Sequence, residues 1–267
     1  MTGSPQAEAG SGICRRLEWD SDFWGFGCAK VEGENLPRDQ IRAIDAWCGA
    51  NDITFLQYLA PQGDTASARV AEEAGFHLVD ERVTLRCSVT SGSSDASVPD
   101  VELRPGNMQD LGALDTIARA GHTDSRYYND PGFPRTGCDD LYSTWIRRSL
   151  EGAIADIVFV PVIDGKAAGY VTCKRDAQPV KTGWIGLVGI GPQARGRGVG
   201  SALIRRAIGW FREAGVEEIL VVTQGRNEAA KRLYERSGFL TRDTGRWYHK
   251  WFGSAAAGDR DQRAAEG

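Results

Sequence analysis

The chain has 267 residues, of which 41% are hydrophobic and 25% charged, with a formal net charge of −4. That length and composition predict a globular protein with a sizeable core, and the negative charge argues against general nucleic-acid binding. No apolar run reaches the roughly 18 residues that cross a bilayer, and residues 1–12 lack the basic start and apolar middle of a signal peptide. We therefore expect a cytoplasmic protein without a membrane or nucleic-acid partner.

The six cysteines and three histidines are scattered, without a C-x-x-C pair or the spacing of metal ligands. We expect free, mostly buried thiols and no metal site.

Composition divides the chain into two parts. Residues 1–12 and 253–267 are rich in small or charged residues and are predicted to be mobile tails. Residues 88–100 have the composition of a linker. They separate a smaller N-terminal domain, residues 13–87, from a larger one, residues 101–252.

A weak internal repeat links the two parts. In each, an amphipathic helix is predicted to end at a glycine, Gly75 or Gly238, that suits a left-handed cap, and an aromatic residue then opens a strand. The glycines are 163 positions apart, and Ala71 stands where the second copy has Tyr234. The first part is interpreted as a partial duplicate. Convergence on a common helix–glycine–strand arrangement is the alternative.

The second part predicts alternating strands and helices around one mixed sheet, an α/β (α+β) fold. Asp164-Gly165 is the turn signal of a hairpin. In chain order we expect a strand at 101–104, helices at 108–119 and 141–150, hairpin strands at 155–163 and 168–174, a strand at 184–190, a helix at 201–214, a strand at 218–223, a helix at 227–237 and a final strand pair or strand at 239–251.

The stretch Arg195–Gly200, with the sequence RGRGVG, connects the apolar run 184–190 to the helix 201–214. Glycines allow successive N–H groups to converge on one anion at the positive end of a helix, so a phosphate cradle is predicted. The spacing fits neither the dinucleotide fingerprint nor the P-loop. Residues 184–252 also hold twelve Lys/Arg against six Asp/Glu, which suits a phosphorylated ligand; a solvated basic face is the alternative.

The pattern Arg195-x-x-Gly198-x-Gly200 resembles the acetyl-CoA pyrophosphate loop of the GCN5-related N-acetyltransferases, the GNAT superfamily. The resemblance implies a GNAT fold, with the first part as a partial GNAT-like domain, and an acyl-CoA-dependent N-acetyltransferase whose cofactor is acetyl-CoA. The residues it assigns to cofactor binding are Leu187, Val188, Ile190, Arg195, Gly196, Arg197, Gly198, Val199, Gly200, Ser201, Asn227 and Tyr234.

In this family the pantetheine arm lies along the strand before the loop, where a bulge frees backbone N–H groups. Gly186 and Gly189 interrupt the run 184–190, which is consistent with a bulge, although a tightly packed core strand would look similar. Leu187 and Val188 are therefore the candidates for main-chain contacts.

Asn227 and Tyr234 lie seven residues apart, about two helical turns, and so share one helix face. The resemblance implies that Asn227 binds the pantetheine region and that the Tyr234 hydroxyl, with a pKa of about 10, protonates the departing thiolate. An N-cap asparagine and an interface tyrosine are the alternatives. The stretch 184–190 contains no carboxylate that could serve as general base, so ordered water is the first candidate. His122 and Asp124 are further candidates; a solvated loop or helix end is the alternative interpretation of both.

Three stretches, 17–25, 125–127 and 225–238, resemble the bacterial dTDP-fucosamine acetyltransferases, which implies a nucleotide-linked, dTDP-type amino sugar as acceptor. The stretch Ser125–Arg135 combines arginines and aromatics that could grip a pyrophosphate and stack on a base or sugar. The predicted acceptor-binding residues are Ser125, Arg126, Tyr127, Tyr128 and Arg135; an ordinary surface loop is the alternative.

Two other functions stay open from sequence. One is a GNAT acetyltransferase for another amine, such as a peptide N-terminus, a polyamine or a drug, and the other is a non-catalytic acyl-CoA sensor. The sequence does not determine the sugar's configuration, the position of its amine, the length of the acyl group or the oligomeric state. A homodimer is one of the states left open.

Overall fold

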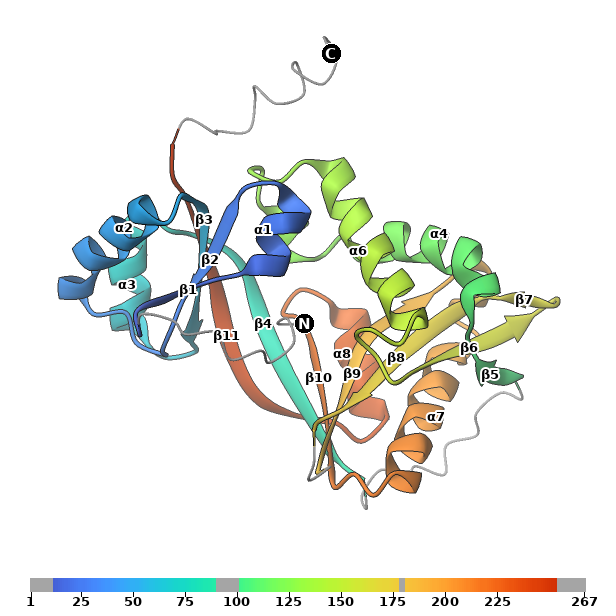
Figure 1. Ribbon diagram of the computed structural model, residues 1–267. Coiled ribbons are helices and arrows are strands. Elements are labelled where there is room, and N and C mark those ends of the chain that lie inside the picture. The colour runs from blue at the N-terminus through green and yellow to red at the C-terminus, as the bar shows by residue number, and fades with distance from the viewer. Residues whose placement is uncertain (1–11, 90–100, 178–180, 254–267) are drawn as a thin grey trace, which may run out of the picture. The chain divides into compact units, whose positions relative to one another are not determined.

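The computed structural model describes residues 12–89, 101–177 and 181–253 (Figure 1). These residues form two compact units. The first unit contains residues 12–82, 124–138 and 244–253, and the second contains residues 83–89, 101–123, 139–177 and 181–243.

The predicted tails and the predicted linker, 88–100, lie almost wholly outside the described residues. The proposed boundary between residues 13–87 and 101–252 stays a prediction. The compact units do not follow a single division along the chain, because residues 124–138 and 244–253 belong to the same unit as the N-terminal residues.

The first unit holds a sheet in the order β1-β2-β3-β11. Strand β2 is parallel to β3, while β1 and β11 are antiparallel to their neighbours. The elements that contribute to this unit are β1 (Cys14–Arg16), α1 (Glu18–Trp24), β2 (Gly27–Val31), a 3-10 turn (Arg38–Gln40), α2 (Ile41–Ala50), β3 (Ile53–Pro61), α3 (Thr65–Glu73), the start of β4 (His77–Ser88), α5 (Arg126–Asn129), the start of α6 (Arg135–Leu150) and most of β11 (Leu240–Trp251).

Alternation along β3 separates the two faces of this sheet. Leu56 and Tyr58 join the core under α2 and α3, which lie together on one face (Figure 1). Phe55 points to the other face, where its ring lies 4.9 Å from Phe133 and 4.7 Å from His249.

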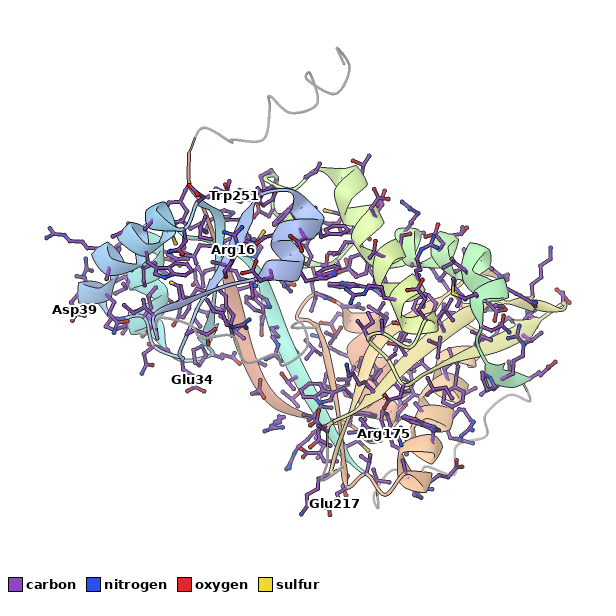
Figure 2. All side chains as sticks on the ribbon, in the orientation of Figure 1. Arg16, Glu34, Asp39, Arg175, Glu217 and Trp251 are labelled. Atoms are coloured by element: carbon purple, nitrogen blue, oxygen red, sulfur yellow. The ribbon has the colours of Figure 1, made fainter. Side chains whose placement is uncertain are left out.

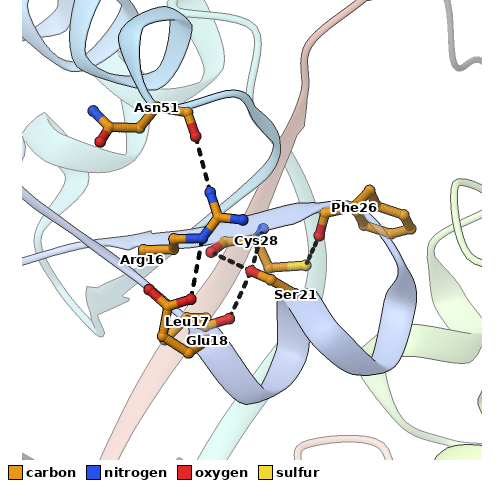
Figure 3. Close-up of polar contacts among 7 residues, drawn as sticks. All are labelled: Arg16, Leu17, Glu18, Ser21, Phe26, Cys28 and Asn51. Atoms are coloured by element: carbon orange, nitrogen blue, oxygen red, sulfur yellow. Dashed lines mark hydrogen bonds and ion pairs between the residues drawn. The ribbon is translucent and has the colours of Figure 1, made fainter.

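Helix α1 is tied to β2 through Ser21, as Figure 3 shows. The Ser21 hydroxyl donates to the Leu17 carbonyl at 2.7 Å and accepts the Cys28 N–H at 2.9 Å. Gly25 ends the helix in the left-handed conformation, with φ 72°. The stretch 17–25, conspicuous in the sequence, is thus a compact helix–turn–strand connection.

The second unit holds a mixed sheet in the order β4-β10-β9-β8-β6-β5, with β7 paired to β6, and the predicted mixed α/β architecture is confirmed. Strand β9 is parallel to β10. The pairs β5–β6, β6–β8 and β8–β9 are each antiparallel. The elements not yet given are β5 (Leu103–Pro105), a 3-10 turn (Met108–Asp110), α4 (Leu111–Gly121), β6 (Ile157–Ile163), β7 (Lys166–Ala167), β8 (Gly169–Arg175), β9 (Thr182–Ile190), a 3-10 turn (Pro192–Ala194), α7 (Val199–Glu213), β10 (Glu218–Gln224) and α8 (Glu228–Arg236).

Helices cover both faces of the second sheet. Leu203, Ala207 and Phe211 of α7 are fully buried in the main core, whereas α4 lies against β8 and β9 on the opposite side (Figure 1). At the end of β8, Arg175 stacks on Trp210 at 5.0 Å and pairs with Asp156 (Figure 2).

Local signals located most elements of this unit. Asp164 and Gly165 both have positive φ, as the predicted hairpin turn requires. Helix α6 starts at Arg135, whereas the sequence predicted a start at 141. The prediction missed the first turns because their residues are mostly polar and carry no apolar periodicity. All six cysteines are free and buried, as expected. In the described part of the chain, every helix is too short or too polar to cross a bilayer.

The predicted repeat has the same geometry in both copies. The side chains of Asp64 and Asn227, also 163 positions apart, cap α3 and α8 in the same way. Gly75 and Gly238 have φ of 85° and 89°. The aromatic N–H after each glycine donates to the carbonyl of the residue that differs between the copies, Ala71 or Tyr234.

The left-handed glycine gives a stability prediction. Gly75→Ala places a Cβ in open space, so its cost is the backbone strain of φ 85°, about 1–2 kcal/mol of unfolding free energy. Gly49→Ala, at an exposed helical position of α2 that is also open, should instead stabilise by about 0.5–1 kcal/mol. Urea unfolding of both variants measures this, and equal effects of the two would contradict it.

Candidate active site

The parallel pairing of β9 and β10 stops partway along the strands. Residues Glu218–Val221 pair with Thr182–Ile185, but β10 continues to Gln224 and β9 to Ile190 without further pairing between these described residues. Unpaired backbone N–H and C=O groups on facing strands need other partners. The backbone groups that border this interval, called the slot below, therefore have no partner on the opposite strand.

A β-bulge marks the point of opening. On β8, Val171 pairs with Val188 and Cys173 with Ile185, so β9 carries an extra residue in this interval. The Leu187 N–H donates to the Thr172 hydroxyl at 2.8 Å. The predicted bulge is confirmed, but the main-chain contact that Leu187 can offer a ligand is limited to its carbonyl group.

The loop after β9 has the conformation of an anion cradle. Gly196 and Gly198 have φ of 71° and 74°, and Gly198 is the N-cap of α7. The first turn of this long helix has no acidic residue and no side-chain cap. The N–H groups of Val199, Gly200 and Ser201 at the positive helix end are thus left to a ligand.

The side chains of this loop mainly shape it. Arg195 Nε donates to the Ile190 carbonyl at 3.1 Å, and Arg197 Nη1 approaches the Gln193 carbonyl at 3.4 Å. A Cβ at Gly200 would meet the Leu233 side chain at 3.2 Å, so this glycine allows α7 to approach α8 closely. Val199 is buried in the core. The cofactor contacts of these residues stay a prediction, for which the loop offers its backbone groups.

Tyr234 lies on α8 with its side chain 4% exposed and its ring 5.7 Å from Phe239. Its hydroxyl has no hydrogen-bond partner among the described residues. Burial raises the pKa of Tyr234 well above its ordinary value. It is therefore a weaker acid than the free side chain assumed from sequence, and it keeps its proton across the physiological range.

Asn227 caps the N-terminus of α8, which is the alternative that the sequence analysis gave for this residue. Its Oδ1 accepts the Ala230 N–H at 3.0 Å. Only the amide nitrogen is left for a ligand, and its role in cofactor binding stays a prediction.

His122 and Tyr170 form a pair on the α4 side of the second sheet. His122 Nε2 lies 2.9 Å from the Tyr170 hydroxyl oxygen, and the imidazole stacks on Tyr142 at 4.3 Å. The sequence had singled out His122 only as one candidate base and had not singled out Tyr170. The sequence feature that could have pointed to Tyr170 is the alternation along β8, which places Tyr170 and Thr172 on the same face of the sheet.

The predicted acceptor-binding residues all lie in the first unit. The Arg126 guanidinium sits 4.4 Å from the ring centres of both Tyr127 and Trp247. Its Nε and the Ser125 hydroxyl are enclosed without a hydrogen-bond partner among the described residues. Arg135 lies 5.1 Å from the Tyr128 ring.

The structure brings two of the motifs noted in the sequence together. The Trp24 ring of α1 lies 5.7 Å from Tyr127 and 4.5 Å from Phe133. Asp20, on the same helix, has its pKa raised by burial, and the nearby Arg126 opposes that shift. The stretches 17–25 and 125–135 therefore form one aromatic, charged cluster inside the first unit.

An Asp–His pair beside this cluster had not been singled out. Asp130 Oδ2 bonds His249 Nδ1 at 2.7 Å and Trp251 Nε1 at 3.0 Å. Burial lowers the pKa of His249 to about 4, although Asp130 favours the charged form. The imidazole is thus neutral at pH 7, and this pair stabilises the fold around Trp251. Sequence distance hid it, because Asp130 and His249 are 119 positions apart.

Comparison with known proteins agrees with this geometry. A model of the acetyltransferase (GNAT) family matches residues 125–239. The chain carries a GNAT acetyltransferase domain.

Two curated relatives extend the likeness of this GNAT protein beyond that domain. The spore coat polysaccharide biosynthesis protein SpsD of Bacillus subtilis (strain 168) is 28% identical over 208 residues, which cover 77% of this chain and 70% of the relative. The dTDP-fucosamine acetyltransferase of Escherichia coli O6:H1 (strain CFT073) is 25% identical over 237 residues, covering 88% and 96%. A solved GCN5-related N-acetyltransferase from Sphaerobacter thermophilus shares the fold, with a TM-score of 0.61 at 18% identity over 89% of this chain and 76% of its own.

The GNAT protein is an acyl-CoA-dependent acetyltransferase, and enzymes of this family generally use acetyl-CoA. The residues present fit that group. The free N–H groups at the start of α7 suit its pyrophosphate, and the slot between β9 and β10 suits its amide-bearing pantetheine arm. When bound, acetyl-CoA supplies the activated acetyl group.

The cradle gives a binding prediction for the GNAT domain. Gly198→Ala adds about 1–2 kcal/mol of strain at φ 74°, which should weaken acetyl-CoA binding by about 5- to 30-fold because fewer molecules hold the cradle. Gly209→Ala, within the same helix and in ordinary contact only with Arg206, should leave the affinity unchanged. Isothermal titration calorimetry measures both; equal affinity for Gly198→Ala and the parent would contradict it.

Proposed function

We propose that the protein transfers the acetyl group of acetyl-CoA to the amino group of a nucleotide-linked amino-deoxysugar, of the dTDP type. The observation that carries the proposal is the setting of Arg126. Its guanidinium carbon lies 4.4 Å from the centres of two aromatic rings, its Nη2 donates to the Tyr127 hydroxyl, and its Nε is enclosed without a partner among the described residues. A preorganised guanidinium suits a diphosphate, and neighbouring rings such as Trp24 suit a base or sugar.

The relatives support the same substrate class. One is named as a dTDP-fucosamine acetyltransferase and covers most of both chains, and another is named for polysaccharide biosynthesis. The likeness to the dTDP-fucosamine acetyltransferase covers 88% of this chain and so includes most of the first unit, where the Arg126 cluster lies.

The mechanism follows from the residues of the second unit. The N–H groups of Val199, Gly200 and Ser201 would hold the pyrophosphate, and the β9–β10 slot would orient the thioester. The Tyr234 hydroxyl, which has no other hydrogen-bond partner among the described residues, would donate its proton to the departing sulfur. Burial of that sulfur beside Tyr234 would raise the thiol pKa too, so the transfer stays balanced despite the raised pKa of the tyrosine.

The acceptor is tested with purified protein, acetyl-CoA and a panel of amines, by measuring released thiol. We expect turnover with dTDP-linked 3-amino or 4-amino sugars and little with peptide N-termini, polyamines or aminoglycoside drugs, because only the nucleotide sugars carry the diphosphate that Arg126 suits. Faster turnover of a peptide or polyamine would reject the proposed acceptor. Thiol release at background with every amine would instead favour a non-catalytic acyl-CoA sensor.

Arg126→Lys is the control for acceptor recognition. Lysine keeps the charge but loses the planar, ring-stacked fork, so KM for the nucleotide sugar should rise about tenfold or more while the affinity for acetyl-CoA stays the same. An unchanged KM would remove Arg126 from acceptor binding.

Tyr234→Phe tests the acid. Phenylalanine keeps the packing against Phe239 and removes only the hydroxyl, so kcat should fall about 100-fold or more while acetyl-CoA affinity stays within about twofold. Tyr248→Phe, which removes a hydroxyl that bonds Glu72, is the matched control and should keep the parent kcat. Unchanged turnover of Tyr234→Phe would remove its assigned role.

A further inference from the structure

The segment that carries Arg126, residues 125–133, contains only one short helix. This helix, α5, has four residues, and a helix of that length is not stable by itself. The conformation of the segment is therefore set by its contacts with the rest of the first unit. We propose that Asp130 and His249 hold this segment so that Arg126 is oriented for the acceptor. The inference rests on the proposed role of Arg126, and both residues act through it as positioning residues without touching the acceptor.

Two side chains of the segment contact one face of β11. The Arg126 guanidinium carbon lies 4.4 Å from the Trp247 ring centre. Asp130 accepts hydrogen bonds from His249 at 2.7 Å and from Trp251 at 3.0 Å. Every second residue of a strand points to the same face, so these three partners form a row along β11. The two attachments are neighbours, and the Arg126 charge is close enough to oppose protonation of His249.

Asp130 also sets the turn that follows α5. Its Oδ1 accepts the Gly132 N–H at 2.8 Å, and its backbone carbonyl accepts the Phe133 N–H at 3.2 Å. The Phe133 ring meets the Tyr127 ring edge-on, with 5.2 Å between the ring centres. The Tyr127 hydroxyl accepts a hydrogen bond from Arg126 Nη2 at 2.8 Å. A continuous path of contacts therefore leads from Asp130 to the guanidinium.

The Asp130–His249 pair is almost fully enclosed, with the two side chains 1% and 0% exposed. Burial raises the pKa of Asp130, but hydrogen bonds from His249 and His77 outweigh burial and leave that pKa well below its ordinary value. The carboxylate is charged and the imidazole neutral at pH 7, so His249 Nδ1 carries the proton of the hydrogen bond. A charge-assisted hydrogen bond away from water is costly to break, which favours one position of the segment.

Two variants of His249 separate hydrogen bonding from packing. His249→Phe keeps a buried ring but removes the donor to Asp130. His249→Asn loses the ring, but its amide nitrogen takes the place of Nδ1. We expect the KM for the nucleotide sugar to rise about tenfold in His249→Phe and to stay within about threefold of the parent in His249→Asn. In both, kcat and the affinity for acetyl-CoA should stay within about twofold of the parent. A KM as high in His249→Asn as in His249→Phe would overturn the proposal.

A double variant tests whether His249 acts through Arg126. On an Arg126→Lys background the oriented guanidinium is already lost, so adding His249→Phe should raise the KM by no more than about twofold. A further tenfold rise would show that His249 acts by another route, and the proposal would be wrong.

Asp45→Asn is the matched control on the same strand. Asp45 of α2 bonds Lys250 of β11 at 2.6 Å, on the face opposite to His249. The change weakens an attachment of β11 that does not lead to Arg126, so the KM for the nucleotide sugar should stay within about twofold of the parent. A tenfold rise in this variant would contradict the proposal, because any loosening of β11 would then have the same effect.

A crystal structure of each His249 variant tests the positioning without an acceptor. We expect the Arg126 guanidinium to leave the Trp247 ring in His249→Phe and to keep its distance of 4.4 Å in His249→Asn. A guanidinium that stays at this distance in His249→Phe would overturn the proposal. If the parent turns over only peptides or polyamines, the proposed acceptor fails, and the positioning of Arg126 is still decided by these two structures.

Discussion

The parallel ladder between β9 and β10 ends at Ile185 and Val221, although both strands continue. A backbone that loses its partner must find another, and here the pairing ends where β9 carries the extra residue of the bulge. The elements assigned to cofactor binding adjoin that interval along the chain. Helix α7 begins after β9, α8 follows β10, and Tyr170 lies over Gly189 on the β8 side.

The two copies of the repeat show how much of this architecture is packing alone. Both have a side-chain cap, a left-handed glycine and a buried aromatic at corresponding positions. Only the second has the RGRGVG loop and a tyrosine at the position of Ala71. The first copy thus keeps the helix and the strand without the anion cradle and the acid.

Local patterns predicted the features whose physics is local. Asp164-Gly165 predicted the hairpin, because few residue pairs adopt two consecutive positive φ values. The glycine loop was predicted too, but the helix after it begins at Val199 rather than at 201. The start of α6 was missed, since Arg135–Asp140 are mostly polar and carry no apolar periodicity. The bulge was predicted from its glycines, but the Thr172 hydroxyl that occupies the Leu187 N–H was not.

The sequence by itself determined the glycine loop, the capped helices and the alternation of the strands, because each depends on residues within a few positions of one another. Only the tertiary structure decided that Trp24 lies beside Tyr127, that Asp130 holds His249, and that His122 faces Tyr170. It also decided the charge states, since burial lowers the pKa of His122 and raises that of Tyr234. Desolvation is set by every atom that surrounds a group, and no short stretch of sequence contains that information.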